Sequence, residues 1–376
     1  MKTFDISQIE YKRILGRTAV QEKSNALPLF WGGSALEINV RSKEVWAYIS
    51  TDYTGHEIWL AVEVNGYQTC RFILGKEPAW YCIAKNLNPA NENLISIIKD
   101  TQPMPDDPAH LMLIHEIGLS PDGCFCPVKP RNCKIEFIGD SITSGEGLAG
   151  NWFENDWITQ WMCASKTYAV QTAKALNADW FTMGQCGWGI CWGWDGNRNS
   201  VMPPHYESVC GILKGQKQSE NGSTAKYDFG SGSDFVVINL GTNDNSAFNQ
   251  PAWKDENGNE YVLTKTKDGF ASDMDGTVII NTVKQFLKTI RKNNPKAKIL
   301  WVWGMMKLDL VPVLIKSGIE SYIKETGDSA VYALELDALE DIEKLPEEHG
   351  SRGHPGAITH KKAAEKISGF IMQKLS

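Results

Sequence analysis

The sequence predicts two domains, an antiparallel β-sandwich followed by a doubly wound α/β domain with a parallel sheet of about five strands. Three observations support this prediction. The chain has 376 residues, which is more than one ordinary compact core accommodates. Strand-like runs without intervening helical periodicity fill residues 30–120, and strands alternate with amphipathic helices from residue 134 onward. Three prolines within 121–130 indicate a linker, so we place the domains at 1–127 and 128–376.

The first domain is predicted from runs that are rich in β-branched and aromatic residues. Asn65-Gly66 follows one of these runs directly and is the pair that a two-residue hairpin turn favours, because both positions need a positive φ. Short strands at this spacing are typical of an antiparallel sandwich. The predicted strands are Val45–Ile49, Ile58–Val64, Cys70–Leu74, Trp80–Ala84, Leu94–Ile98 and Leu111–Ile117.

The second domain is predicted from alternating strands and helices. Ile279, Val283, Phe286, Leu287 and Ile290 fall on one face of a helix, and the segment after Pro355 repeats this pattern. In such a domain, functional sites form beyond the carboxyl ends of the strands. The predicted strands are Lys134–Gly139, Asp179–Met183, Asp234–Leu240, Lys298–Trp303 and Ala330–Leu336.

The composition of the chain argues against some classes of binding partner. A net charge of −7 argues against a nucleic-acid or anionic membrane surface, and no apolar run approaches the length that spans a bilayer. The first ten residues have neither an apolar core nor a cleavage site, so we expect a cytoplasmic protein, unless a signal has been removed. The nine cysteines are then expected to be reduced, and none has the spacing of a metal site. The oligomeric state stays open.

The residues that carry chemistry follow the predicted strands. Lys134–Ile138 ends at Gly-Asp-Ser, which presents Ser141 as a candidate nucleophile. A serine hydroxyl needs a base for its proton and hydrogen-bond donors for the oxyanion that forms. Glycine-rich residues 184–190 follow the second strand, Asn243 follows the third, and His354 precedes the last helix.

This Ser-Gly-Asn-His series resembles the SGNH (GDSL-like) hydrolases, over about residues 134–376. With the β-rich segment ahead of it, the whole chain is similar to carbohydrate esterase family two, which joins a jelly-roll to a flavodoxin-like SGNH domain. The resemblance implies that Ser141 is the nucleophile and His354 the general base. It also implies an oxyanion hole made by the backbone N–H groups of Ser141 and Gly187 with the Asn243 side chain, and it implies neither a cofactor nor a metal.

The chain departs from the family at one position. Most SGNH enzymes have an aspartate three residues before the histidine, and this chain has Ser351 there. We therefore predict a Ser–His dyad in which a backbone carbonyl orients the imidazole. The alternative is a distant carboxylate, for which the candidates are Glu347, Glu348 and Asp337.

Seven of the fourteen tryptophans lie between Trp152 and Trp194. Indole rings on glycine-rich loops at the carboxyl end of a sheet suit stacking on a pyranose, although packing within the loops is the alternative. Trp188 and Trp192 are the individual residues we favour for substrate binding. Asp140 and Asn245 adjoin the motifs and complete the predicted set of substrate-binding residues, and Asp140 is also expected to accept a backbone N–H in its turn.

The resemblance implies an enzyme, a serine carboxylic-ester hydrolase that removes O-acetyl groups from oligosaccharides or polysaccharides derived from plant hemicellulose. Mannan, glucomannan and xylan all stay open as substrates, as does the hydroxyl that carries the acetate. Two other hypotheses remain. One keeps the chemistry and acts on a lipid or thioester acyl group, and the other is a carbohydrate-binding protein without catalysis.

Overall fold

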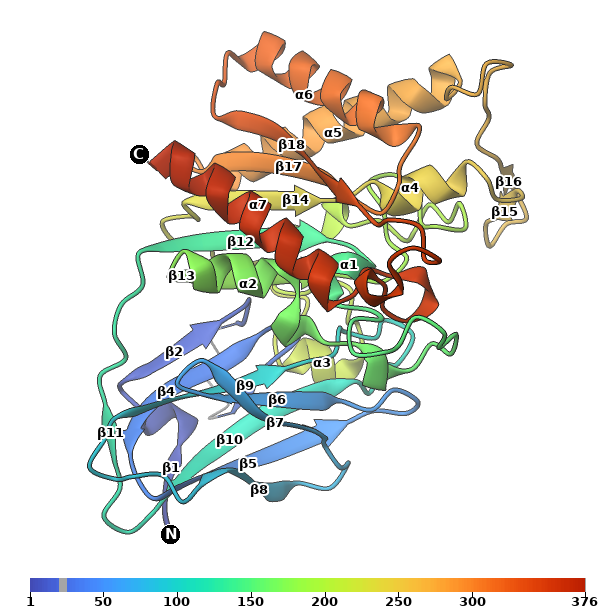
Figure 1. Cartoon of the computed structure of the whole chain (residues 1–376). Helices are drawn as coiled ribbons and strands as arrows, with labels where there is room; N and C mark the ends of the chain where they lie inside the picture. The colour runs from blue at the N-terminus through green and yellow to red at the C-terminus, as the bar shows by residue number, and fades with distance from the viewer. Residues whose placement is uncertain (20–25, 376) are drawn as a thin grey trace. The chain divides into compact units, whose positions relative to one another are not determined.

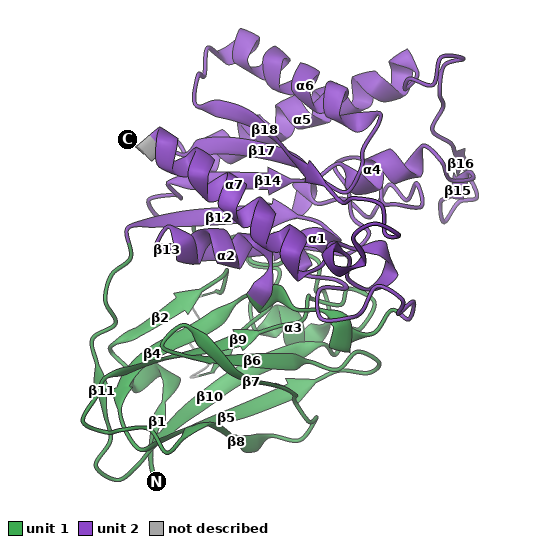
Figure 2. Ribbon diagram, viewed as in Figure 1, with its two compact units in different colours: residues 1–131, 157–165, 207–228 green, residues 132–156, 166–206, 229–376 purple. Residues whose placement is uncertain are grey.

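The computed structural model describes residues 1–19 and 26–375 and divides the chain into two compact units (Figures 1 and 2). The first unit contains residues 1–131 with two later segments, 157–165 and 207–228. The second unit contains residues 132–156, 166–206 and 229–376. The chain first passes from the first unit to the second between residues 131 and 132, close to the predicted linker. Nothing in the sequence indicated that two segments beyond it belong to the first unit.

The first unit is built on two antiparallel sheets. One contains β1 (Lys2–Asp5), β10 (Leu111–Leu119), β5 (Glu44–Asp52) and β8 (Ala79–Lys85) in that order, and β3 (Leu27–Pro28) pairs with β10. The other runs β11 (Cys124–Cys126), β4 (Ala35–Arg41), β9 (Asn93–Lys99), β6 (Trp59–Val64) and β7 (Tyr67–Ile73), with β2 (Lys12–Leu15) on β4. A short helix, α3 (Gln216–Glu220), belongs to one of the later segments.

Alternation of side chains fixes the register of this sandwich. Along β5, every second residue from Val45 to Thr51 is buried and the residues between them are partly exposed, which is the period of a strand with one face on a core. The turn between β6 and β7 has the predicted geometry, because Asn65 and Gly66 both have positive φ, 54° and 84°. Both sheets pack their apolar faces into one hydrophobic core.

The second unit has a five-stranded parallel sheet, as predicted. Its order is β13 (Ala178–Gly184), β12 (Cys133–Gly139), β14 (Phe235–Asn239), β17 (Lys298–Met305) and β18 (Val331–Ala338). Every residue of β14 is buried, as expected for a central parallel strand covered on both faces. Gly139 lies opposite both Gly184 and Asn239, so the loops after these three strands leave the sheet at one level.

Helices cover this sheet. From β12, the chain crosses to β13 on one side through α2 (Tyr168–Ala175), and from β14 it crosses to β17 on the other side through α5 (Asp273–Asn293). Right-handed crossovers in opposite directions place these helices on opposite faces. The helix α7 (Ala357–Leu375) packs with α2, and α6 (Val311–Thr326) packs with α5 (Figure 1). The remaining elements are α1 (Ser141–Ser144), α4 (Thr242–Ala247) and a hairpin of β15 (Trp253–Lys254) and β16 (Glu260–Tyr261).

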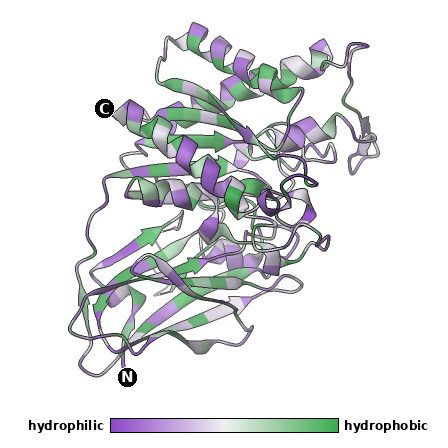
Figure 3. Cartoon of the chain, viewed as in Figure 1, coloured by the Kyte–Doolittle hydropathy of each residue, from purple (hydrophilic) through white to green (hydrophobic). Residues whose placement is uncertain are grey.

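Hydrophobic residues gather on the strands and on the inner sides of the helices (Figure 3). Among the described residues, no helix combines the length and the apolar character needed to cross a bilayer. Over the same residues, we find no cluster of three or more His, Cys, Asp or Glu side chains suited to hold a metal ion.

Candidate active site

The candidate nucleophile lies in a tight turn at the end of β12. The strand ends at Gly139, and Ser141 begins the single-turn helix α1. Asp140 caps this helix, because its carboxylate Oδ1 accepts the backbone N–H of Ile142 at 3.0 Å. No larger residue fits at position 139, where a Cβ would lie 2.0 Å from Thr143 Oγ1. Close packing of the turn therefore fixes the position of Ser141, which is buried to 5% exposure.

His354 reaches the nucleophile from the turn before α7. Its Nε2 lies 3.0 Å from Ser141 Oγ, and its Nδ1 lies 3.3 Å from the carbonyl oxygen of Arg352. A carbonyl can only accept, so the proton of a neutral imidazole belongs on Nδ1. Nε2 is then free to accept the proton of the Ser141 hydroxyl. This is the arrangement that a Ser–His dyad oriented by a backbone carbonyl requires.

The carboxylates considered as a third member have other partners. Glu348 forms an ion pair with Lys362, and Asp337 with Lys366. Glu347 is exposed in a short turn before the histidine. The structure gives none of the three a contact with His354.

The predicted oxyanion residues follow the neighbouring strands. Gly187 lies in the loop after β13 and has a φ of 77°, which favours glycine. Asn243, in the first turn of α4 after β14, donates its side-chain amide to the carbonyl oxygen of Trp188 at 2.8 Å. This bond ties the two loops together and leaves the second amide hydrogen of Asn243 for a substrate oxygen. Ser141, Gly187 and Asn243 thus lie beyond the same edge of the sheet.

Two buried aspartates support these loops. Asp244 accepts the backbone N–H groups of Ile190, Cys191 and Trp192, which holds the glycine-rich loop in place. Burial raises the pKa of Asp244 to about 6, against the opposing effect of these donors. Burial also raises the pKa of Asp140 to about 7, although the Ile142 N–H acts in the opposite direction. Both carboxylates act on the backbone around the site.

The predicted substrate-binding residues differ in their exposure. Trp188 is partly exposed and packs against His205, with ring centroids 5.3 Å apart. Trp192 is only 3% exposed and packs edge-on against Phe248. Asp140 is fully buried, and Asn245 accepts the N–H groups of Leu310 and Val311 at the start of α6. Trp192, Asp140 and Asn245 are thus all buried, and their role in substrate binding stays a prediction.

The aromatic side chain at the surface beside Gly187 is Trp194. It is 54% exposed, and its backbone N–H donates to the carbonyl of Gly187. A Cβ at position 187 would lie 3.0 Å from Trp194 Cδ1, so the absence of a side chain there admits the indole. Sequence reasoning included Trp194 in the cluster but favoured Trp192, which the structure buries.

Sequence reasoning missed two charged residues beside the dyad, Glu146 and Arg352. Glu146 Oε2 lies 3.6 Å from His354 Nε2, and Glu146 Oε1 accepts a hydrogen bond from Arg352 Nη1 at 2.6 Å. Gly145 and Gly147 flank this carboxylate, and this was the one available signal.

The site as a whole has the components of acyl transfer. A hydroxyl contacts an imidazole with a free acceptor nitrogen, and glycine and asparagine donors lie on adjacent loops. This set suits attack on an ester carbonyl.

Comparisons with known proteins agree with this geometry. The model of the GDSL-like lipase/acylhydrolase family matches residues 137–334. The chain is similar to an acetyl xylan esterase from the rumen bacterium Butyrivibrio proteoclasticus, at 36% identity and a TM-score of 0.94, covering 100% of this chain and 99% of that one.

Two curated relatives are more distant. Cellulase/esterase CelE of Acetivibrio thermocellus is 25% identical over 92% of this chain and 37% of its own length. The acetylxylan esterase / glucomannan deacetylase of Cellvibrio japonicus is 28% identical over 53% of this chain and 46% of its own length. The chain thus spans less than half the length of these two relatives. With more than half of its residues matched by the family model, the chain belongs to the GDSL-like lipase/acylhydrolase family.

Proposed function

We propose that this protein is a carbohydrate O-acetylesterase that removes acetyl groups from oligosaccharides or polysaccharides derived from plant hemicellulose. The observation that carries the proposal is the contact between Ser141 Oγ and His354 Nε2, with Nδ1 directed at a carbonyl. The names of the relatives support the substrate class, since they include an acetyl xylan esterase and a glucomannan deacetylase.

The geometry supports a serine acyl-enzyme mechanism. Ser141 Oγ attacks the acetyl carbonyl while His354 Nε2 takes its proton, and the carbonyl oxygen becomes an oxyanion that the backbone donors and Asn243 stabilise. His354 then protonates the departing sugar hydroxyl, which leaves an acetyl-serine. A water molecule, deprotonated by His354, attacks this ester and releases acetate, and the proton returns to Ser141. The chain's own residues supply each proton transfer.

Aromatic residues beside the site support a sugar substrate. The exposed indole of Trp194 lies next to Gly187, and Trp188 is partly exposed in the same loop. A pyranose ring offers an apolar face of C–H groups that packs on such rings. The predicted aromatic platform is therefore retained with Trp194 and Trp188 as its members.

The first experiment tests catalysis with an aryl acetate and with acetylated xylan and mannan oligosaccharides, whose products are identified by NMR. We expect acetate release from both kinds of substrate, and a loss of at least about 10³-fold in Ser141→Ala. Activity that persists in Ser141→Ala would overturn the mechanism. Faster cleavage of aryl octanoate than of aryl acetate would favour a lipid or thioester substrate, and the absence of any hydrolysis would favour a binding protein.

Trp194→Ala separates sugar recognition from chemistry. The change should raise KM for the acetylated oligosaccharide and leave kcat/KM for the aryl acetate nearly unchanged, because the small ester does not reach the indole. An equal effect on both substrates would indicate that Trp194 supports the oxyanion loop and does not bind sugar.

A further inference from the structure

We propose that Glu146 and Arg352 form a positioning pair that orients His354 and stabilises its protonated form. The inference deepens the proposed function and rests on it, because it assigns the role of the acid that is missing at position 351. It concerns residues that act through His354, and it holds for any acyl ester that the dyad cleaves.

Arg352 presents its carbonyl to His354 through an unusual backbone conformation. Its φ and ψ are 55° and 34°, in the left-handed region that residues other than glycine rarely adopt. Its backbone N–H donates to the carbonyl of Glu154 at 2.9 Å, and its guanidinium donates to Glu146. In this conformation the Arg352 carbonyl oxygen lies 3.3 Å from His354 Nδ1, so the contacts that hold Arg352 also hold the imidazole.

Glu146 connects both members of the dyad. Its backbone N–H donates to the carbonyl of Ser141 at 3.0 Å, so the residue is fixed to the nucleophile turn. Its side chain is 8% exposed, and one carboxylate oxygen binds Arg352 while the other lies 3.6 Å from His354 Nε2. This last distance is too long for a hydrogen bond that would compete with Ser141. It is short enough for attraction to the positive charge that His354 acquires during attack.

Position 351 explains why such a pair is needed. Ser351 is 1% exposed, and its hydroxyl has no hydrogen-bond partner in the described part of the chain. Its backbone N–H donates to the carbonyl of Gly147, so the segment that carries Arg352 and His354 is anchored to the turn that carries Glu146. The negative charge that the usual aspartate would supply on the Nδ1 side is supplied here by Glu146 on the other side of the ring.

The other titratable groups around the dyad do not duplicate this charge. Burial raises the pKa of Cys186 well above its ordinary value, and the nearby Glu146 carboxylate raises it further, so this thiol stays neutral. Burial lowers the pKa of His360 on α7 to about 3, which keeps it neutral too. Asp140 is bound to the backbone of its own turn. Glu146 is thus the carboxylate that lies beside His354 Nε2, and Arg352 is its ion-pair partner.

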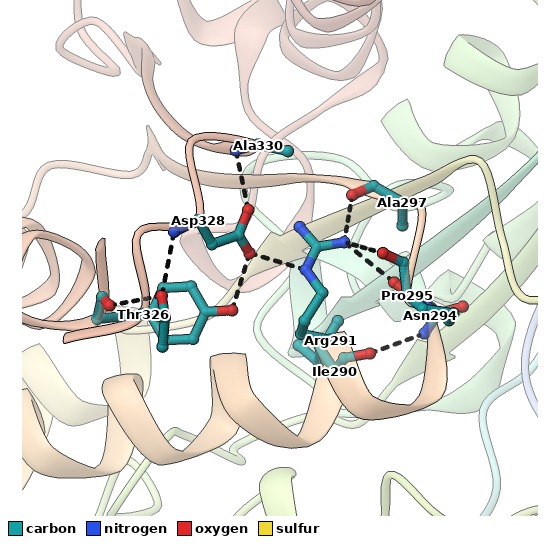
Figure 4. Close-up of polar contacts among 9 residues, drawn as sticks. Ile290, Arg291, Asn294, Pro295, Ala297, Thr326, Asp328 and Ala330 are labelled. Atoms are coloured by element: carbon teal, nitrogen blue, oxygen red, sulfur yellow. Dashed lines mark hydrogen bonds and ion pairs between the residues drawn. The ribbon is translucent and has the colours of Figure 1, made fainter. Parts of the chain in front are cut away.

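A second arginine–carboxylate pair in the same unit provides a matched control (Figure 4). Arg291 Nε donates to Asp328 at 2.7 Å, and its Nη1 donates to the carbonyl oxygens of Asn294, Pro295 and Ala297. Like Arg352, this arginine links a carboxylate to the backbone of a turn. It lies at the ends of α5 and α6, where the chain enters strands β17 and β18, and it belongs to none of the catalytic loops.

The test compares Glu146→Gln, Arg352→Gly and Asp328→Asn on aryl acetate hydrolysis. Gln keeps the shape of the side chain without its charge, and Gly accepts the backbone of residue 352 without the guanidinium. We expect kcat to fall about 10–100-fold in the first two variants with KM within about twofold, below the roughly 10⁴-fold effect of a triad acid because the carbonyl remains. Asp328→Asn should keep the wild-type kcat and KM.

The pH profile distinguishes positioning from mere support of the fold. Removing the Glu146 charge weakens the attraction for a proton on His354, so the acidic limb of kcat/KM should move to lower pH in Glu146→Gln. The Glu146→Gln, Arg352→Gly double variant should lose no more than about threefold beyond the more damaged single variant, because both changes act through His354. Circular dichroism melting verifies that each variant is folded.

Three results decide the inference. Wild-type kcat and an unmoved acidic limb in folded Glu146→Gln would overturn it, as would fully multiplicative losses in the double variant. Equal losses in Asp328→Asn would attribute the effect to general destabilisation and would also overturn it. An inactive wild-type protein would instead contradict the proposed function, so the two failures are distinguishable.

Discussion

Polar residues serve different purposes at the two ends of the strands in the parallel sheet of the second unit, which we call the amino edge and the carboxyl edge. At the amino edge, Asp234 accepts the backbone N–H of Lys134, and Arg291 ties Asp328 to the turn before β17. The hydrogen bonds of these groups are made within the protein, to the backbone or to one another. At the carboxyl edge, the side chains of Ser141, Asn243 and His354 contact one another or the loops and still keep hydrogen-bonding capacity for a substrate. Polar residues at the amino edge therefore stabilise the fold, and those at the carboxyl edge keep donors and acceptors available for a substrate.

Among substitutions that test the difference between the two edges, Asn243→Ala at the carboxyl edge should reduce activity most. The change removes a donor for the oxyanion and the bond to the Trp188 carbonyl, so kcat for aryl acetate should fall about 10²–10³-fold. Steady-state kinetics checks this, with the melting temperature as the control for folding. A loss below about fivefold would remove Asn243 from the oxyanion hole.

A smaller effect concerns the stability of the carboxyl edge, through Asp140. Burial raises its pKa to about 7, against about 3.9 in an unfolded chain, so between these values the folded protein binds more protons than the unfolded chain does. The contribution of Asp140 to stability is therefore greatest below about pH 4 and decreases by roughly 2–4 kcal/mol as the pH rises to about 7.

Asp140→Asn should flatten this dependence, because Asn keeps an oxygen for the Ile142 N–H and does not ionise. The measurement is the free energy of unfolding in urea at several pH values from 4 to 8. Part of the slope should persist, since burial also raises the pKa of Asp244, to about 6. Identical slopes in the variant and the wild type would contradict the assignment to Asp140.

The smallest effect on activity is expected at the amino edge. Asp328→Asn weakens the bonds from Arg291 and from the Tyr322 hydroxyl, and should lower the free energy of unfolding by about 1–2 kcal/mol. Hydrolysis of the aryl acetate at 25 °C should not change. A selective fall in kcat without a loss of stability would contradict the division between the two edges.

Much of the fold was predictable because its signals are local. The strands of the second unit are continuous apolar runs, and the Asn65-Gly66 turn is specified by two adjacent residues. These predictions of the fold were confirmed. Ser141 and His354 were each identified from a short motif of consecutive residues. The structure places Ser141 Oγ 3.0 Å from His354 Nε2.

What could not be predicted depends on contacts between distant residues. The pairing of Glu146 with Arg352 joins positions 206 residues apart, and the left-handed backbone of Arg352 has no glycine to indicate it. Asn245 follows the Gly-Thr-Asn-Asp motif, but its side-chain oxygen Oδ1 accepts the backbone N–H of Leu310 at the start of α6, which no spacing along the chain reveals. Residues 157–165 and 207–228 return to the first unit for the same kind of reason.

The contact between Ser141 and His354 spans 213 residues of chain, and this has a consequence for biosynthesis. A ribosome completes the nucleophile, the oxyanion loops and all five strands of the parallel sheet before it makes the base. During that interval the nascent domain contains a serine without a proton acceptor. Hydrolytic competence therefore arises in one late step, when the segment around His354 docks against Gly147.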